Sequence, residues 1–319
     1  MIFEKQIINT YKGMMYARCD DTETVFYFSD EDFPGLEKES YAVTASAGHT
    51  LQGYIYRYEG SLPERLVVFD HGFGGGHKAY MKEIEMLCKH GYTVFAYDHT
   101  GCMESGAESA GGLAQSLCDL NDCIGAIIAD SRFRGVDISV MGHSWGAFST
   151  LNICALYPQI SHIVALCGFV SVEEMVKTFF SGALKGYQKA IFALEKESNP
   201  RFALFDARDT LQRVSPKALL IYSENDALCK KRHYDMLKAA LNGKENVTLM
   251  LVENKGHNPN YTEDAVKQLA AFGKARARLL RKKRITAEQK ARFKASFDWD
   301  GMTRQDPKVW ERIFTCLDN

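Results

Sequence analysis

The sequence predicts an α/β protein in which a mostly parallel β-sheet carries helices on both faces. Short apolar runs rich in β-branched or aromatic residues recur along the chain, and segments with helical periodicity separate most of them. Strands that alternate with helices in this way form parallel sheets covered on both sides. In addition, residues 41–58 alternate around a Gly-His turn, which predicts a hairpin that adds antiparallel strands at one edge.

The predicted parallel strands are, in chain order, RLVVFD (65–70), TVFAYD (93–98), DISVMG (137–142), HIVALCG (162–168), KALLIYS (217–223) and NVTLMLV (246–252). The helical patterns between them are AYMKEIEMLCKHG, LAQSLCDLNDCIGAIIAD, AFSTLNICALYP and KRHYDMLKAAL. We therefore expect residues 1–168 and 214–273 to form one core.

Two segments depart from the alternation of strand and helix. Residues 169–213 contain several helical pieces rich in Phe and Tyr, and we expect them to form a helical cap over the edge of the sheet where open α/β sheets bind ligands. The alternative is an extra helical layer that does not contact a substrate. Residues 274–319 are expected to form a C-terminal helical tail, whose basic run KARARLLRKKR predicts a solvated helix face or, as the alternative, a site for an acidic partner.

Composition sets limits on the class of protein. With 319 residues, 46% of them hydrophobic, the chain can bury a large core, and a formal net charge of −1 gives no field that would recruit nucleic acid. No window reaches the roughly 18 uncharged apolar residues of a membrane-spanning helix, and the N-terminus lacks a secretory leader pattern. We therefore expect a cytoplasmic protein whose nine scattered cysteines are reduced and mostly buried.

The segment VMGHSWGAFS carries the first candidate for chemistry. Ser144 lies where the strand 137–142 turns at once into a helix, with Gly142 and Gly146 two residues to either side. Such a turn forces its central residue into a strained backbone conformation, and glycines let strand and helix approach closely enough to form it. The serine hydroxyl would then project above the sheet at a helix N-terminus, which is the placement of a nucleophile.

A serine hydroxyl needs a base to remove its proton and a carboxylate to orient that base. His257 follows the strand 246–252, and Asp226 follows the strand 217–223, so both loops leave the edge of the sheet to which the serine points. We predict His257 as the base and Asp226 as its partner, with Glu224 on the same loop as the alternative carboxylate.

An acyl-transfer site also needs N–H donors for the oxyanion of a tetrahedral intermediate. We predict the backbone N–H groups of Trp145, directly after the serine, and of Phe73, in the glycine-rich loop HGFGGG after the strand 65–70. Glycine-rich loops also bind phosphate, but this one lacks the G-K-[ST] ending of a P-loop.

With these motifs in place, the sequence resembles the α/β-hydrolase superfamily, especially serine hydrolases of the monoglyceride-lipase and S33-aminopeptidase-like branch. The resemblance rests on DHGFGGG, HGYTVFAYDHTGCMESG, GHSWG, YSENDALC and KGHNPN, and it spans residues 41 to about 272. It implies an α/β-hydrolase fold with an eight-stranded sheet, a helical cap and a metal-independent hydrolase activity. Relatives often carry D-x-R-G-x-G-x-S where this chain has DHTGCMES, so Thr100 and Met103 depart from the pattern.

From these residues we expect a serine esterase that cleaves a small-molecule acyl substrate through an acyl-Ser144 intermediate, with no cofactor and no metal. A peptidase, an amidase or a thioesterase with the same triad is the alternative among enzymes. A non-catalytic binding protein of the same fold is the alternative of another class. Aromatic residues of the expected cap are candidates for the substrate pocket, namely Phe169, Phe179, Phe180 and Tyr187.

Overall fold

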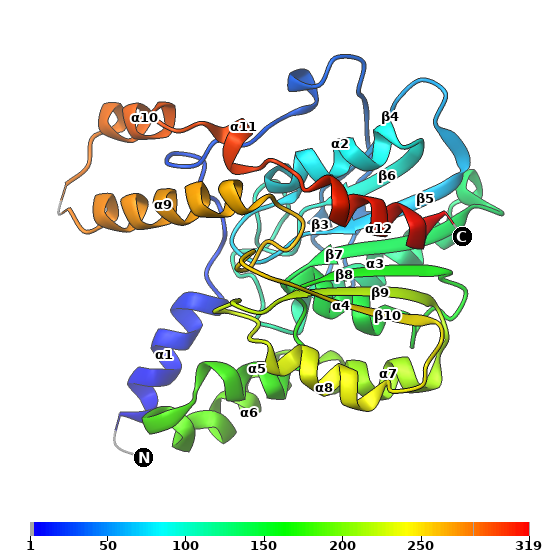
Figure 1. The fold of residues 1–319 in the computed structure, drawn as a ribbon. Coiled ribbons are helices and arrows are strands. Elements are labelled where there is room, and N and C mark those ends of the chain that lie inside the picture. Colours follow the sequence, from blue (N-terminus) through cyan, green and yellow to red (C-terminus); the bar gives the residue numbers. More distant parts are fainter. Residues whose placement is uncertain (1–2, 283, 319) are drawn as a thin grey trace.

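The computed structural model describes residues 3–282 and 284–318, and an eight-stranded sheet lies at its centre (Figure 1). The strand order is β1-β4-β6-β5-β7-β8-β9-β10. The strands are β1 (Glu37–Ser40), β4 (Gly53–Arg57), β5 (Leu62–Asp70), β6 (Tyr92–Tyr97), β7 (Asp137–His143), β8 (His162–Leu166), β9 (Lys217–Ser223) and β10 (Val247–Val252). The strands from β6 to β10 in this order pair in parallel, while β1 and β4 are antiparallel. The predicted mostly parallel sheet is confirmed.

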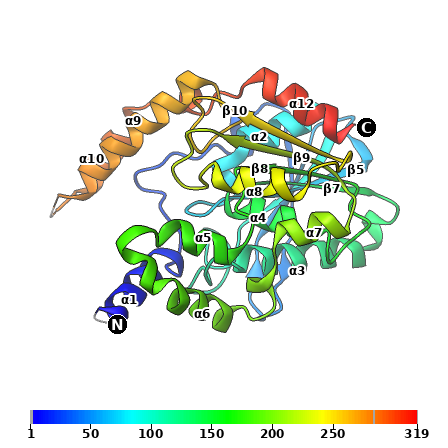
Figure 2. The ribbon, with the colours of Figure 1, turned by 60° about the horizontal axis from the view of Figure 1, so that its bottom comes forward.

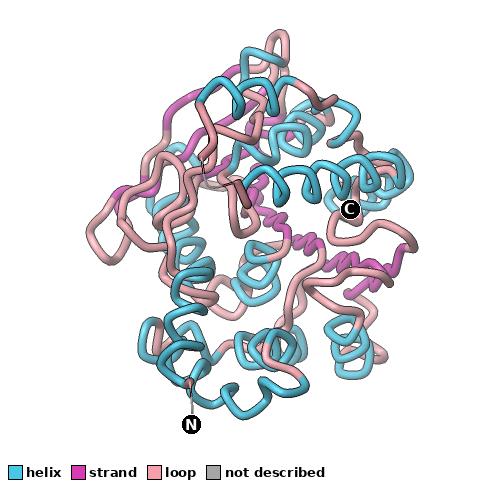
Figure 3. Tube along the Cα trace, turned by 90° about the vertical axis from the view of Figure 1, so that its left-hand side faces the viewer, coloured by secondary structure: helices cyan, strands magenta, loops and turns pink. Residues whose placement is uncertain are grey.

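Each face of the sheet has its own apolar core, because successive side chains of a strand point to opposite sides. On β5, Leu66 and Val68 belong to one core, and Val67 and Phe69 belong to the other. The first core is covered by α3 (Gln115–Ala129), α4 (Trp145–Ile153), α7 (Ala207–Arg213) and α8 (Arg232–Ala240). The second is covered by α2 (Met81–Lys89) and α12 (Pro307–Leu317). Figure 3 shows helices on both sides of the strands.

The antiparallel edge differs from the predicted hairpin. The Gly-His turn closes only a short separate ribbon of β2 (Val43–Thr44) and β3 (Thr50–Leu51). The strand β4 instead pairs with Glu37–Ser40, upstream of the predicted segment. This edge strand is largely exposed and reads EKES, so it carries no apolar alternation that would have revealed it.

A helix that the sequence analysis did not predict, α1 (Glu4–Met15), lies beside the helices that follow β8 (Figures 1 and 2). Those helices are α5 (Val172–Phe179), the 3₁₀ helix Gly182–Tyr187 and α6 (Gln188–Ser198). The carboxylate of Glu195 on α6 is fully buried and accepts hydrogen bonds from the hydroxyl of Tyr11 at 2.7 Å, the hydroxyl of Tyr16 at 3.2 Å and the backbone N–H of Leu113 at 2.8 Å. This cluster fixes α1 to α6.

The C-terminal residues form a projecting pair of helices and then return to the sheet. Helices α9 (Glu263–Leu280) and α10 (Ala287–Ala295) extend from the body, and α9 runs through the expected boundary at 273/274 (Figure 1). After the short α11 (Trp299–Met302), helix α12 buries Val309, Trp310 and Ile313 in the second core. The end of the expected tail therefore supplies a helix that, together with α2, covers this face.

Within residues 3–282 and 284–318, none of the helices has the length and apolar composition needed to cross a membrane. The nine cysteines are free thiols, and seven of them are buried.

Glu83 on α2 is a buried carboxylate at the seam where the C-terminal segment meets the core. Its Oε1 accepts a hydrogen bond from the side-chain amide of Asn260 at 2.9 Å, whereas its Oε2 has no hydrogen-bond partner among the described residues. Burial raises the pKa of Glu83 to about 7, although the hydrogen bond from Asn260 opposes the shift.

We predict that Glu83→Gln removes a pH dependence of stability. A carboxyl group whose pKa is raised by folding stabilises the protein fully below its ordinary pKa, and this contribution is lost as the pH rises through about 7. Between pH 5 and pH 8 the wild type should therefore lose about 2–3 kcal/mol relative to the variant. Urea unfolding at both pH values measures the difference, and parallel pH profiles would contradict the prediction.

Candidate active site

Ser144 occupies a strained turn between β7 and α4. Its φ of 56° and ψ of −108° lie outside the regions that non-glycine residues commonly adopt. A Cβ on Gly142 would overlap the hydroxyl of Thr150, and a Cβ on Gly146 would overlap the carbonyl oxygen of Asp70. The two glycines are therefore required, because β7, α4 and the end of β5 meet here without room for a side chain.

The structure brings together the three residues predicted for the triad. The ring of His257 is hydrogen-bonded through Nε2 to the Ser144 hydroxyl at 2.8 Å and through Nδ1 to the Asp226 carboxylate at 2.7 Å. The serine, the base and the carboxylate come from the loops after β7, β10 and β9, which open at the same edge of the sheet. This geometry can move a proton from Ser144 to His257 while Asp226 holds the ring.

The carboxylate next to His257 is that of Asp226, whose side chain is fully buried, whereas Glu224 is exposed. Its Oδ1 accepts the backbone N–H groups of Leu228 at 2.8 Å and Cys229 at 3.1 Å. Burial by itself would raise the pKa of Asp226, but the hydrogen bond and charge of His257, followed by the Leu228 N–H, outweigh burial and lower it. Asp226 is thus kept ionised beside the imidazole.

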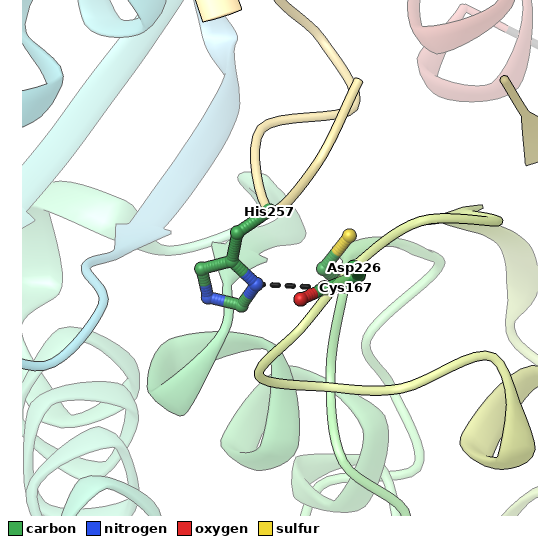
Figure 4. Close-up of side chains that lie close together, drawn as sticks. All are labelled: Cys167, Asp226 and His257. Carbon is green, nitrogen blue, oxygen red and sulfur yellow. Dashed lines mark hydrogen bonds and ion pairs between the residues drawn. The ribbon is translucent and has the colours of Figure 1, made fainter. Parts of the chain in front are cut away.

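Cys167, directly after β8, lies next to Asp226 and His257 (Figure 4). The sulfur, carboxylate and ring nitrogen lie within 4.8 Å of one another, so this is a donor set that could hold a metal ion. Burial, followed by the charge of Asp226, raises the pKa of the Cys167 thiol well above its ordinary value. The protonated sulfur is a hydrogen-bond donor to Asp226 and a poor metal ligand, since metals bind the thiolate.

His143, directly before the serine, connects the two loops that border the site. Its Nδ1 accepts a hydrogen bond from the Tyr80 hydroxyl at 2.8 Å, and its Nε2 donates to the backbone carbonyl of His257 at 2.7 Å. The same Tyr80 hydroxyl accepts the N–H of Gly72 at 3.1 Å. Burial, and then the nearby His257, lower the pKa of His143 to about 3, so its ring stays neutral and keeps both roles.

A buried charged cluster lies beneath the glycine-rich loop. His99 lies between the carboxylates of Asp70, 2.7 Å from its Nε2, and Asp119, 3.1 Å from its Nδ1. Burial would lower the pKa of His99, but the two carboxylates outweigh it and raise the pKa to about 10. The backbone N–H of His99 donates to Nε2 of His71 at 2.9 Å, and Nδ1 of His71 donates to the carbonyl of Gly72 at 2.8 Å. These bonds fix the start of the loop.

Trp145 and Phe73, whose backbone N–H groups are the predicted oxyanion donors, both border the same cavity as Ser144. Trp145 is the first residue of α4, where a backbone N–H has no acceptor within the helix and where the helix dipole favours negative charge. The rings of the two residues pack edge to face with centroids 5.0 Å apart. Trp145 is held in turn by a hydrogen bond from its indole N–H to the carbonyl of Leu113 at 2.8 Å.

The Ser144 hydroxyl faces a mainly apolar cavity of about 290 Å³. Its walls are formed by Met14, Met15, Gly72, Phe73, Tyr80, Leu113, His143, Ser144, Trp145, Phe169, Met175, Phe179, Leu228 and His257. Of the four predicted pocket residues, Phe169 and Phe179 line this cavity, Phe180 lines an adjacent groove, and Tyr187 is not among the residues that border either one.

The contributions of α1 and of Tyr80 to the site were not predicted from the sequence. The signal for α1 was present, because Ile7, Tyr11, Met14 and Met15 follow one another at the spacing of one helix face. Tyr80 gave no comparable signal, since its role depends on a hydroxyl that meets both the nearby Gly72 and His143, which is 63 residues away in the chain.

Comparison with known proteins agrees with this fold. Residues 61–205 match a family model described as serine aminopeptidase, S33, and none of the curated protein sequences compared with the chain matches it. An esterase structure from Pyrococcus furiosus is similar with a TM-score of 0.59 and 19% identity, over 81% of this chain and 96% of that one. A putative dienelactone hydrolase from Klebsiella pneumoniae subsp. pneumoniae has a TM-score of 0.53 and 16% identity, over 89% and 99%.

A third similar structure, Est1E from Butyrivibrio proteoclasticus with bound ferulic acid, has a TM-score of 0.56 and 15% identity over 74% of this chain and 99% of that one. The predicted α/β-hydrolase fold is confirmed. The family-model match includes the strained turn at Ser144 but ends before Asp226 and His257.

We predict that Gly146→Ala destabilises the protein by about 3 kcal/mol or more, because the new methyl group overlaps the Asp70 backbone, which cannot move without disturbing β5. Gly273→Ala is the matched control, since Gly273 lies in α9 with open space around its Cβ position. This control should be neutral or stabilise by up to about 1 kcal/mol. Chemical denaturation measures both, and equal effects would contradict the steric explanation.

Proposed function

We propose that the chain is a serine hydrolase that cleaves carboxylic esters through an acyl-Ser144 intermediate. The observation that carries this proposal is the unbroken hydrogen-bond relay from Ser144 through His257 to Asp226 at the wall of an apolar cavity. The strained serine and the buried carboxylate both have an energetic cost, which a protein that only binds a ligand would not need to meet.

In the proposed reaction, Nε2 of His257 takes the proton of Ser144 while the serine oxygen attacks the ester carbonyl carbon. The backbone N–H groups of Trp145 and Phe73 stabilise the oxyanion of the tetrahedral intermediate. The carbon–oxygen bond to the alcohol breaks, and the alcohol leaves with the proton returned by His257. Water, deprotonated by the same histidine, then attacks the acyl-enzyme, which releases the acid and restores Ser144.

Residues 169–213 serve as the cap in this proposal. Phe169, Met175 and Phe179 border the cavity from this segment, so its side chains meet the acyl group of a substrate held at Ser144. The substrate is therefore a small molecule with an apolar acyl group.

Peptide cleavage is the second candidate, because the matched family model is described as serine aminopeptidase. An aminopeptidase has to bind a charged α-amino group, which a carboxylate does best. The described residues that line the cavity include neither Asp nor Glu. The absence of a carboxylate from this lining favours an ester over a peptide as the substrate. A thioester would be cleaved at the same site by the same mechanism.

The wild type should be labelled by a fluorophosphonate probe and should hydrolyse p-nitrophenyl esters faster than aminoacyl anilides. In Ser144→Ala, labelling should be lost and kcat for esters should fall by about 10⁴-fold or more, because the nucleophile is gone. Circular dichroism checks that the variant is folded. Turnover of anilides alone would replace the esterase assignment with a peptidase, and a folded wild type that resists the probe would contradict both.

Asp226→Asn should lower kcat by about 10³- to 10⁴-fold, because the amide favours the wrong tautomer of His257 and cannot stabilise its charged form. Glu224→Gln is the matched control on the same loop, and its kcat should equal that of the wild type, since Glu224 is exposed. Steady-state kinetics with one p-nitrophenyl ester compares the two variants. A larger loss in the Glu224 variant would reverse the assignment of the carboxylate.

A further inference from the structure

A second hollow adjoins the cavity at Ser144. This groove has a volume of about 270 Å³ and is lined by Ile7, Thr10, Tyr11, Met14, Met15, Phe179, Phe180 and Leu184. Three of these residues, Met14, Met15 and Phe179, also border the cavity at Ser144, so the two hollows meet at shared side chains. Met14 and Met15 are flexible and polarizable, which lets such a boundary adjust to a ligand.

The wall of the groove is almost entirely hydrocarbon. The hydroxyl of Tyr11 is directed to Glu195 at 2.7 Å, which leaves its ring for the groove, and the hydroxyl of Thr10 bonds to the backbone carbonyl of Gln6 at 3.0 Å. No charged side chain is among the described residues that line it. The groove therefore suits an apolar chain without ionic groups.

Several large apolar side chains at the groove are exposed. The exposed fraction is 65% for Met14, 39% for Leu184 and 36% for Phe179. Exposed apolar side chains that gather in one place indicate a surface that a ligand or partner covers. Because Met14, Met15 and Phe179 border both this groove and the cavity at Ser144, an occupant of the groove is part of the substrate rather than a separate partner.

The helix α1 that forms one side of the groove is held in place. Glu195 is fully buried and binds both Tyr11 and Tyr16, and the ring of Tyr11 packs edge to face on Phe180 with centroids 5.8 Å apart. Moving α1 away would leave the buried carboxylate without two of its donors, which is costly. The groove is thus formed before any substrate arrives.

We infer that this groove, built by α1 and the 3₁₀ helix Gly182–Tyr187, holds the distal part of a long, linear acyl chain whose carbonyl lies at Ser144. The inference rests on the proposed function, and it names the substrate class as esters of long-chain fatty acids. Each hollow alone lies at the lower limit of roughly 300 Å³ for ligand sites, whereas the two together lie within the usual range. The helix α1 is therefore a determinant of acyl-chain specificity that lies outside the matched family region.

The test compares kcat/KM for p-nitrophenyl acetate, butyrate, octanoate and laurate. Each further methylene buried in the groove should raise kcat/KM of the wild type by about fourfold until the chain fills it. Leu184→Trp narrows the groove, so the ratio of kcat/KM for laurate to that for acetate should fall by about tenfold or more. Thr10→Trp, which changes a residue of α1 that also lines the groove, should lower the same ratio.

Leu204→Trp is the matched control, because Leu204 is 64% exposed in the same segment and borders neither hollow. Its ratio of laurate to acetate should equal that of the wild type. Acetate turnover with no rise toward laurate, or ratios unchanged in Leu184→Trp and Thr10→Trp, would overturn the groove while leaving the esterase assignment intact.

Binding provides a readout that does not depend on catalysis. Fluorescence of cis-parinaric acid should report binding to Ser144→Ala, with displacement by laurate, and adding Leu184→Trp should weaken binding by about tenfold. If no ester is hydrolysed, the proposed function fails, and this experiment still decides whether the groove holds an acyl chain. Equal affinity with and without Leu184→Trp would refute the groove.

Discussion

The site depends on one steric constraint, the close approach of α4 to the end of β5. At Gly146 the helix passes so near the Asp70 carbonyl that a methyl group does not fit, and this contact forces the abrupt turn in which Ser144 takes a positive φ. The turn raises the serine above the sheet, where the loops after β9 and β10 bring Asp226 and His257 to it. Without this approach the three side chains would have no common meeting point.

Electrostatic differences among buried histidines support the same geometry. His99 lies between two carboxylates, is held charged and anchors the glycine-rich loop after β5. His143 is buried without a carboxylate partner among the described residues, is held neutral and anchors the loop of His257. Because these rings do not change protonation near neutral pH, the walls of the site would keep their hydrogen bonds during the proton transfer between Ser144 and His257 in the proposed reaction.

Much of the fold and of the site could be read from sequence because the relevant signals are local. Apolar runs marked the parallel strands, and Ser144, Asp226 and His257 each follow such a run in chain order. The edge strand Glu37–Ser40 could not be read, because an exposed strand needs no apolar pattern. The position of Met14 in the cavity wall could not be read either, because helical periodicity identifies an apolar face but not the surface on which it packs.

The return of α12 to the sheet has a consequence for the order in which the chain folds. While α2 covers the second face over β4 and β6, the part over β8 and β9 is covered only when residues 307–317 arrive, although its strands are complete by residue 252. During synthesis from the N-terminus, the apolar side chains that α12 will cover remain open to water until α9 and α10 have been made. Nascent chains should therefore depend on chaperones until late in translation, since uncovered apolar sheet faces favour aggregation.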